Sequence, residues 1–140
     1  MLVRSQWQHL IPHRDAMCLL DTVLAWDDER IHATAISHRE PANPLRSGDL
    51  CAVHLCEYGA QAMALHGGLL AQRDGRAARP GLLVSLRAVH LHVARIDDLP
   101  GILDVHAKRL LAGESGWQYA FRAEHTGRVL AAGRATVVLA

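Results

Sequence analysis

The stretch LCAVHLCEYGAQAMALHGGLLAQ, residues 50–72, decides the fold of this chain. It contains no proline, shows no strict alternation, and is rich in Ala, Leu, Met and Gln, so it predicts one helix with Asp49 as a plausible N-cap. Its many alanine and glycine residues allow a sheet to approach closely. One carboxylate, Glu57, lies within this small and apolar surface, and we expect it to face a functional pocket.

The segments on either side of this helix have the character of strands. Upstream, MCLLDTVLAW (17–26) and IHATAIS (31–37) flank the turn DDER and predict a hairpin. Downstream, four segments predict successive antiparallel strands, and they span residues 81–96, 101–113, 116–127 and 128–140. Because a single helix interrupts the strands, we expect an α+β domain whose antiparallel sheet wraps around one long central helix. No linker or repeat divides the chain, so residues 1–140 are expected to form a single domain.

Composition argues against several classes of function. Fifteen basic and fourteen acidic residues leave a formal net charge of +1, which predicts no nucleic-acid binding. The three cysteines have no C-x-x-C spacing, and His90 and His92 share one side of a strand without a third ligand, so neither a metal nor another cofactor is expected. The sequence shows no signal peptide and no run of eighteen apolar residues, which predicts a cytoplasmic protein without membrane insertion.

Motifs along nearly the whole chain resemble a known family. LIPHRDAMCLLDTVLAW (10–26) is similar to the LPHR...LLVDRV opening of the beta-hydroxyacyl-ACP dehydratases, and EYGAQ matches their E-x-x-x-Q pattern. The segments NPLR and EYGAQAMALHG resemble more closely the dehydratase-like hotdog proteins of aryl-polyene gene clusters. The resemblance implies a hotdog fold and a hydro-lyase that removes water from a 3-hydroxyacyl thioester to give the trans-2-enoyl thioester.

The resemblance also implies roles for particular residues. Glu57 corresponds to the catalytic carboxylate that acts on the leaving hydroxyl, and Gln61 corresponds to the glutamine one turn later that supports it. The family carries a catalytic histidine fourteen residues before the acid, where this chain has Asn43. A neutral amide is no base, so Asn43 is expected to orient substrate. His54, on nearly the same helical face as Glu57, either replaces the missing base, only hydrogen-bonds the acid, or takes an exposed or dimer-facing position.

Alternatives remain open at the level of sequence. Loss of the usual histidine motivates a non-catalytic subunit that binds acyl thioesters or serves as a scaffold, and acyl thioester hydrolysis is a weaker possibility because hotdog thioesterases also use a helix carboxylate. His13 and Arg14, in the PHR motif, are expected to hold the start of the first strand.

The partners that we expect follow from the fold and from one basic loop. A lone curled sheet leaves an open edge, which predicts a homodimer or pairing with a related hotdog subunit. The loop QRDGRAARP (72–80) places Arg73, Arg76 and Arg79 together, and an acidic acyl carrier protein is the partner that such a basic rim would bind.

Overall fold

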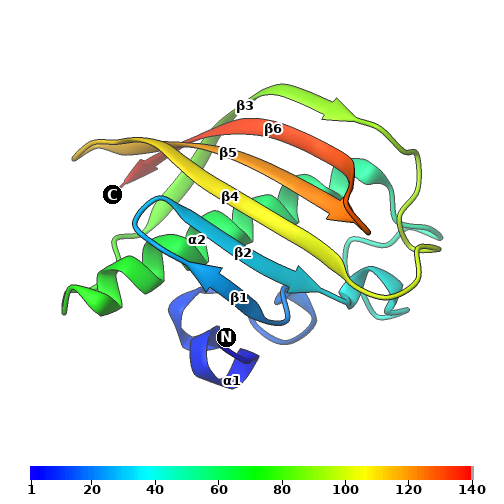
Figure 1. Ribbon diagram of the computed structural model, residues 1–140, viewed down its shortest axis with the longest axis horizontal. Coiled ribbons are helices and arrows are strands. Elements are labelled where there is room, and N and C mark those ends of the chain that lie inside the picture. The colour runs from blue at the N-terminus through cyan, green and yellow to red at the C-terminus, as the bar shows by residue number, and fades with distance from the viewer. Residues whose placement is uncertain (140) are drawn as a thin grey trace.

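A six-stranded antiparallel sheet curls around one long helix in the computed structural model, which describes residues 1–139 (Figure 1). The long helix is α2, Leu55–Arg73. The strands are β1 (Val23–Trp26), β2 (Arg30–Ala35), β3 (Gly81–Leu91), β4 (Leu103–Ala112), β5 (Gly116–His125) and β6 (Arg128–Leu139). The short helical segments are α1 (Arg4–Trp7), η1 (Gln8–Leu10), η2 (Asp15–Met17), η3 (Ser37–Arg39) and η4 (Ala52–His54). The predicted α+β fold, with its sheet wrapped around a central helix, is confirmed.

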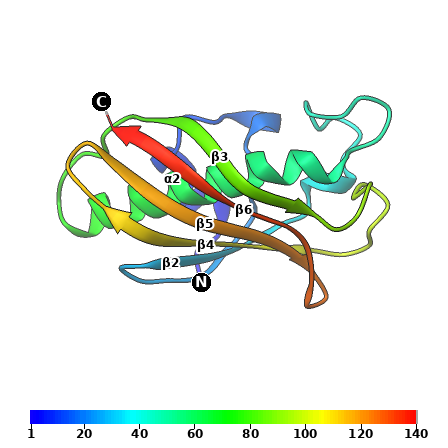
Figure 2. The same cartoon turned by 90° about the horizontal axis from the view of Figure 1, so that it is seen from above.

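The hydrophobic core lies between α2 and the face of the sheet that curls toward it (Figure 2). Thirteen of the 19 residues of α2 are buried, so the helix is covered over most of its circumference. Small residues make this close packing possible. A Cβ atom on Gly59 would lie only 2.6 Å from Cδ2 of Phe121 in β5. The glycine and alanine content of α2 therefore sets a short distance between helix and sheet.

The order of strands in the sheet is β1-β2-β4-β5-β6-β3. The expected succession of four antiparallel strands holds for β4, β5 and β6, whereas β3 pairs with β6 at the far edge. The connection formed by residues 92–102 explains this placement, because it packs against the start of the helical region. Ile96 N donates a hydrogen bond to Leu50 O at 2.9 Å, and Ala52 N donates to Ala94 O at 3.1 Å. The chain thus crosses from one edge of the three-stranded meander to the other.

The helical region begins later than the sequence predicts. The 3-10 turn η4 precedes α2, and Cys51 rather than Asp49 occupies the N-cap position of that turn. Cys51 N donates a hydrogen bond to Nδ1 of His54 at 3.0 Å, so the imidazole closes the turn that leads into α2. The carboxylate of Asp49 instead accepts from the Cys51 thiol, with 3.9 Å between Sγ and Oδ1.

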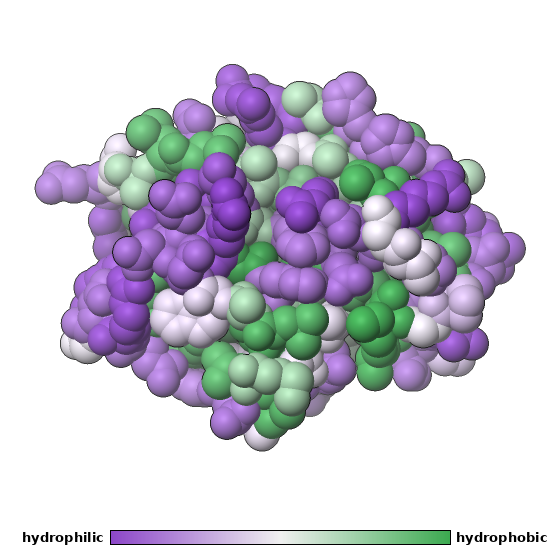
Figure 3. All heavy atoms as spheres, in the orientation of Figure 1, coloured by the Kyte–Doolittle hydropathy of each residue, from purple (hydrophilic) through white to green (hydrophobic). Residues whose placement is uncertain are grey.

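Strand β3 is exposed along almost its whole length, on both faces and at its outer edge. Six large apolar side chains are exposed on or near it, namely Leu82, Leu83, Val84, Leu86, Val89 and Leu91. Figure 3 shows hydrophobic side chains at the surface among hydrophilic ones on one face of the molecule. A strand with unpaired backbone groups and exposed apolar side chains is the surface of this chain best suited to pairing with another sheet.

Two further findings concern the described part of the chain. None of the helices within residues 1–139 is long and apolar enough to cross a membrane. Within the same residues, no group of three His, Cys, Asp or Glu side chains is arranged to hold a metal ion. The rings of His90, in β3, and His92, just after it, stack with centroids 6.5 Å apart.

Candidate active site

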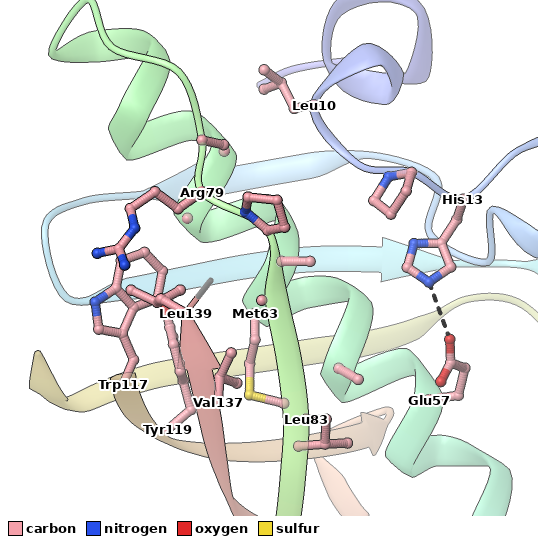
Figure 4. Close-up of a pocket in the computed structure, with 18 of the residues that line it drawn as sticks. Leu10, His13, Glu57, Met63, Arg79, Leu83, Trp117, Tyr119, Val137 and Leu139 are labelled. Atoms are coloured by element: carbon pink, nitrogen blue, oxygen red, sulfur yellow. Dashed lines mark ion pairs between the residues drawn. The ribbon is translucent and has the colours of Figure 1, made fainter. Parts of the chain in front are cut away.

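A cavity of about 480 Å³ runs along one side of α2 (Figure 4). The helix contributes Glu57 and a row of small residues, the loop before β1 contributes Pro12 and His13, and residues 76–83 form the opposite side. Trp117 and Tyr119 of β5 line the end of the cavity that is farthest from Glu57 (Figure 4). Most of the lining is apolar, so the few polar side chains that face the cavity are candidates for chemistry.

The polar pair at one end of this cavity is formed by His13 and Glu57. Nε2 of His13 lies 3.4 Å from Oε1 of Glu57, and the two side chains are 25% and 34% exposed. The imidazole points from the loop toward the carboxylate on the first turn of α2 (Figure 4). An imidazole and a carboxyl group therefore lie side by side in a partly enclosed, largely apolar cavity, an arrangement that can support general acid–base catalysis.

Gln61 connects Glu57 to the loop that carries His13. Its side chain is fully buried, and Oε1 accepts a hydrogen bond from Leu19 N at 2.9 Å. Nε2 donates to Met17 O at 2.7 Å and to Oε1 of Glu57 at 3.3 Å. Because these bonds hold residues 17–19 against the helix, this segment does not extend β1, which begins only at Val23. One side chain thus fixes both the orientation of the acid and the position of the loop.

Arg14 supplies the second anchor of the same loop. Its Nη1 donates to the carbonyl oxygens of Gln8 at 3.4 Å and His13 at 3.1 Å, and it also hydrogen-bonds the carbonyl of Ile11. Arg14 thus holds the turn at residues 8–13, and these bonds do not reach the start of β1, where the sequence predicted the PHR motif to act. The ring of His13 is left to face Glu57, a role that the sequence did not suggest.

Asn43 lies in the loop before the helical region and does not line the cavity. It is 5% exposed, and Nδ2 donates to Ser37 O at 3.0 Å and to Tyr58 Oη at 3.1 Å. Its Oδ1 accepts from Leu45 N at 2.9 Å. Burial raises the pKa of the Tyr58 phenol, so this tyrosine stays protonated in the network. These contacts make Asn43 an anchor of its loop.

The structure places His13, and not His54, next to Glu57. Nδ1 of His54 accepts from Cys51 N at the start of the helical region, while the imidazole paired with Glu57 comes from a loop 44 positions earlier. Helical spacing points only to neighbours along the same helix, so it favours His54. The sequence singles out His13 only through the PHR motif, and the motif does not indicate which residue the imidazole contacts.

The sequence of residues 5–140 matches the ApeP-like family, described as ApeP dehydratase. The chain belongs to this family of ApeP-like dehydratases. A solved structure titled "The Dehydratase Heterocomplex ApeI:P from Xenorhabdus doucetiae" contains a chain that is 25% identical to this dehydratase, with a TM-score of 0.84 over 95% of this chain and 90% of that one. The predicted hydroxyacyl dehydratase of the aryl-polyene type, a hydro-lyase, is thereby confirmed.

More distant solved structures share the fold with this ApeP-like dehydratase. A hypothetical thioesterase with coenzyme A from Streptococcus pneumoniae has a TM-score of 0.61 at 14% identity, with 84% of each chain covered. The thioesterase HI1161 from Haemophilus influenzae has a TM-score of 0.63 at 11% identity, covering 100% of this chain and 92% of that one. A comparison with curated proteins gave no match. At such low identity the two thioesterases support the hotdog fold alone.

Proposed function

We propose that this dehydratase acts on 3-hydroxyacyl thioesters bound to an acyl carrier protein, and that His13 and Glu57 are its catalytic pair. The observation that supports this proposal is the 3.4 Å contact between Nε2 of His13 and Oε1 of Glu57 at one end of the apolar cavity. Asn43 stands where the beta-hydroxyacyl-ACP dehydratases carry their catalytic histidine, and its side chain stabilises the loop in which it lies. His13 supplies the imidazole from a different segment.

In the proposed reaction, Nε2 of His13 removes a proton from the carbon next to the thioester carbonyl. The carboxylic acid of Glu57 gives its proton to the β-hydroxyl, the carbon–oxygen bond breaks, and water leaves as the carbon–carbon double bond forms. His13 is then an imidazolium and Glu57 a carboxylate. Because the two groups are adjacent, the proton can return from Nε2 to the carboxylate of Glu57, and rotation of the carboxyl group then brings it to the oxygen that faces the substrate, so no other proton donor is needed.

Gln61 has a supporting role in this proposal. Its Nε2 donates to Oε1 of Glu57, the oxygen that also faces His13, so the second carboxyl oxygen is left for the substrate hydroxyl. Gln61 also fixes residues 17–19 and thereby the loop that carries the base. His54 and Asn43 influence the site only through the start of the helical region and through the preceding loop.

The exposed edge of β3 supports a second hotdog subunit as the structural partner. Its unpaired edge and six exposed apolar side chains would be covered if the strand paired with the corresponding strand of another sheet. The partner can be a second copy of this chain or a related subunit, and the similarity to a chain of a dehydratase heterocomplex favours the related subunit. Since β3 also lines the cavity at Gly81 and Leu83, such a partner would lie next to the site.

The basic loop after α2 supports docking of an acidic carrier protein. Arg76 and Arg79 line the cavity, and Arg73 precedes them at the end of the helix. Opposite charges would attract the carrier to this face of the molecule.

The cysteines at positions 18, 51 and 56 are all free, in keeping with the reducing cytoplasm, where we place the protein.

The decisive experiment measures enoyl product from a 3-hydroxyacyl carrier protein, with the dehydratase alone and mixed with its hotdog partner. His13→Asn and Glu57→Gln are each expected to lower kcat by about 10²–10⁴, the contribution of a general acid or base. His9→Asn is the matched control, because this exposed histidine lies outside the cavity in the preceding turn. Wild-type turnover in both His13→Asn and Glu57→Gln would refute the assignment of the catalytic pair.

A further inference from the structure

The end of the cavity opposite His13 and Glu57 is lined by aromatic side chains that are held in place. Tyr119 Oη lies 2.7 Å from Nδ1 of the buried His66, and Nε2 of His66 lies 2.8 Å from Asp27 O. A carbonyl oxygen only accepts, so Nε2 of His66 donates and carries the proton, Nδ1 accepts, and the hydroxyl of Tyr119 donates. Burial raises the pKa of Tyr119 and lowers that of His66, which keeps both groups neutral. The network therefore ties β5 to α2 and to the turn after β1.

Trp117 is fixed beside Tyr119 by two further contacts. The guanidinium carbon of Arg109 lies 5.3 Å from the centroid of the indole, and Nη2 of Arg109 donates to Asp28 O at 3.2 Å. The rings of Trp117 and Tyr119 meet edge to face with centroids 6.2 Å apart. A cation on one side and an aromatic neighbour leave the indole little freedom to move out of the cavity.

Gly67 of α2 gives the indole its space. A Cβ atom at this position would lie 2.7 Å from Cζ3 and 3.2 Å from Cη2 of Trp117, closer than side chains pack. These two atoms belong to the outer edge of the six-membered ring, so any side chain at position 67 would push the indole away from the helix. Gly67 and Trp117 together therefore determine where the cavity ends.

The distance from the acid to this wall corresponds to the length of an acyl chain. Glu57 and Gly67 are ten residues apart on α2, which is about 15 Å along the helix axis. An extended alkyl chain advances about 1.3 Å per bond, because its bonds of about 1.5 Å zigzag, so this distance holds on the order of ten carbon atoms. Between the two ends, the helix presents Ala60, Met63 and Ala64, which offer a path without charged groups.

We propose that Trp117, positioned by Gly67, ends the acyl channel and sets the longest chain that the enzyme accepts. This inference rests on the proposed function in one respect, namely that the reacting carbons lie at His13 and Glu57. The tail of the acyl group then points along α2 toward the indole. In the opposite orientation the pantetheine arm would pass Trp117. The indole would then contact the pantetheine, which is the same in every substrate, and not the end of the acyl chain.

Chain-length preference separates these two orientations. Binding of hexanoyl, decanoyl and tetradecanoyl pantetheine thioesters is measured by calorimetry, with the dehydratase alone and in complex with its hotdog partner. Trp117→Ala is expected to raise the affinity for the tetradecanoyl relative to the decanoyl thioester by about tenfold, the effect of burying about two more methylene groups. Gly67→Ala is expected to change the same ratio, because the displaced indole alters the length of the channel.

Trp26→Ala is the matched control. Trp26 is also half-buried and has a guanidinium, that of Arg73, 5.9 Å from its ring centroid, but it lies on β1 outside the cavity. Its loss should leave the chain-length profile unchanged. If Trp117→Ala fails to fold, Trp117→Phe takes its place in the test, because it retains an aromatic ring in the packed position. Its thermal midpoint shows whether the variant is folded. Its preference should shift toward longer chains by a smaller amount.

Two outcomes would overturn the inference. One is an equal loss of affinity for all three thioesters in Trp117→Ala and Trp117→Phe, which would place the pantetheine arm at the indole. The other is an unchanged profile in both variants. Because these saturated thioesters carry no hydroxyl group, binding is read without any dehydration. A shifted profile in an enzyme that makes no enoyl product would thus contradict the proposed reaction and leave the role of Trp117 intact.

Discussion

Replacing Gln61 by leucine tests whether one buried amide holds the site together. Leucine has nearly the same size but can neither accept from Leu19 N nor donate to Met17 O and to Glu57. Two backbone groups in the interior then lose their partners, at about 1–3 kcal/mol each. Burial of the leucine side chain recovers about 1–2 kcal/mol. The free energy of unfolding is therefore expected to fall by about 2–4 kcal/mol.

Urea denaturation measures this change, with equal m-values showing that the extent of unfolding is the same. The control is Gln72→Leu, near the end of the same helix, where the side chain is exposed and the change should stay within about 0.5 kcal/mol. Activity should fall as well, because Glu57 loses a hydrogen bond and the loop with His13 keeps only the hydrogen bonds of Arg14. If Gln61→Leu costs no more stability than Gln72→Leu, the role assigned to this amide is refuted.

Two further predictions concern stability. Burial lowers the pKa values of His38 and His66, so below about pH 6.5 the unfolded chain binds protons that the folded chain does not. Stability should therefore fall as the pH drops from about 6.5, by up to about 1.4 kcal/mol per pH unit for each histidine, and a flat urea-denaturation series across this range would contradict the burial of neutral imidazoles. Gly59→Ala should cost about 1–3 kcal/mol, because its Cβ would meet the ring of Phe121 at 2.6 Å. Restoration of stability by a second change, Phe121→Leu, would support that cause, whereas a thermal midpoint equal to that of the wild type in Gly59→Ala alone would argue against it.

The elements of the fold follow largely from local patterns. The absence of proline and the helix-forming composition of residues 50–72 predict α2, and the apolar runs bounded by turn residues predict the strands. The glycine and alanine residues of α2 predict close packing of the helix against the sheet, which the approach of Phe121 to Gly59 confirms. The edge position of β3 does not follow from such patterns, because it depends on how the connection 92–102 packs against the start of the helical region.

The sequence by itself determined that Glu57 and Gln61 lie side by side, because they are one turn apart on a single helix and helical geometry fixes their relation. Only the tertiary structure decided the partner of the acid. His13 lies 44 positions from Glu57, and its approach depends on a loop held by Gln61 and Arg14. His54 was the neighbour that spacing favoured, yet its ring nitrogen is used by Cys51 N in closing the first turn. Contacts between distant segments come from the packing of the whole chain, and periodicity along one element carries no information about them.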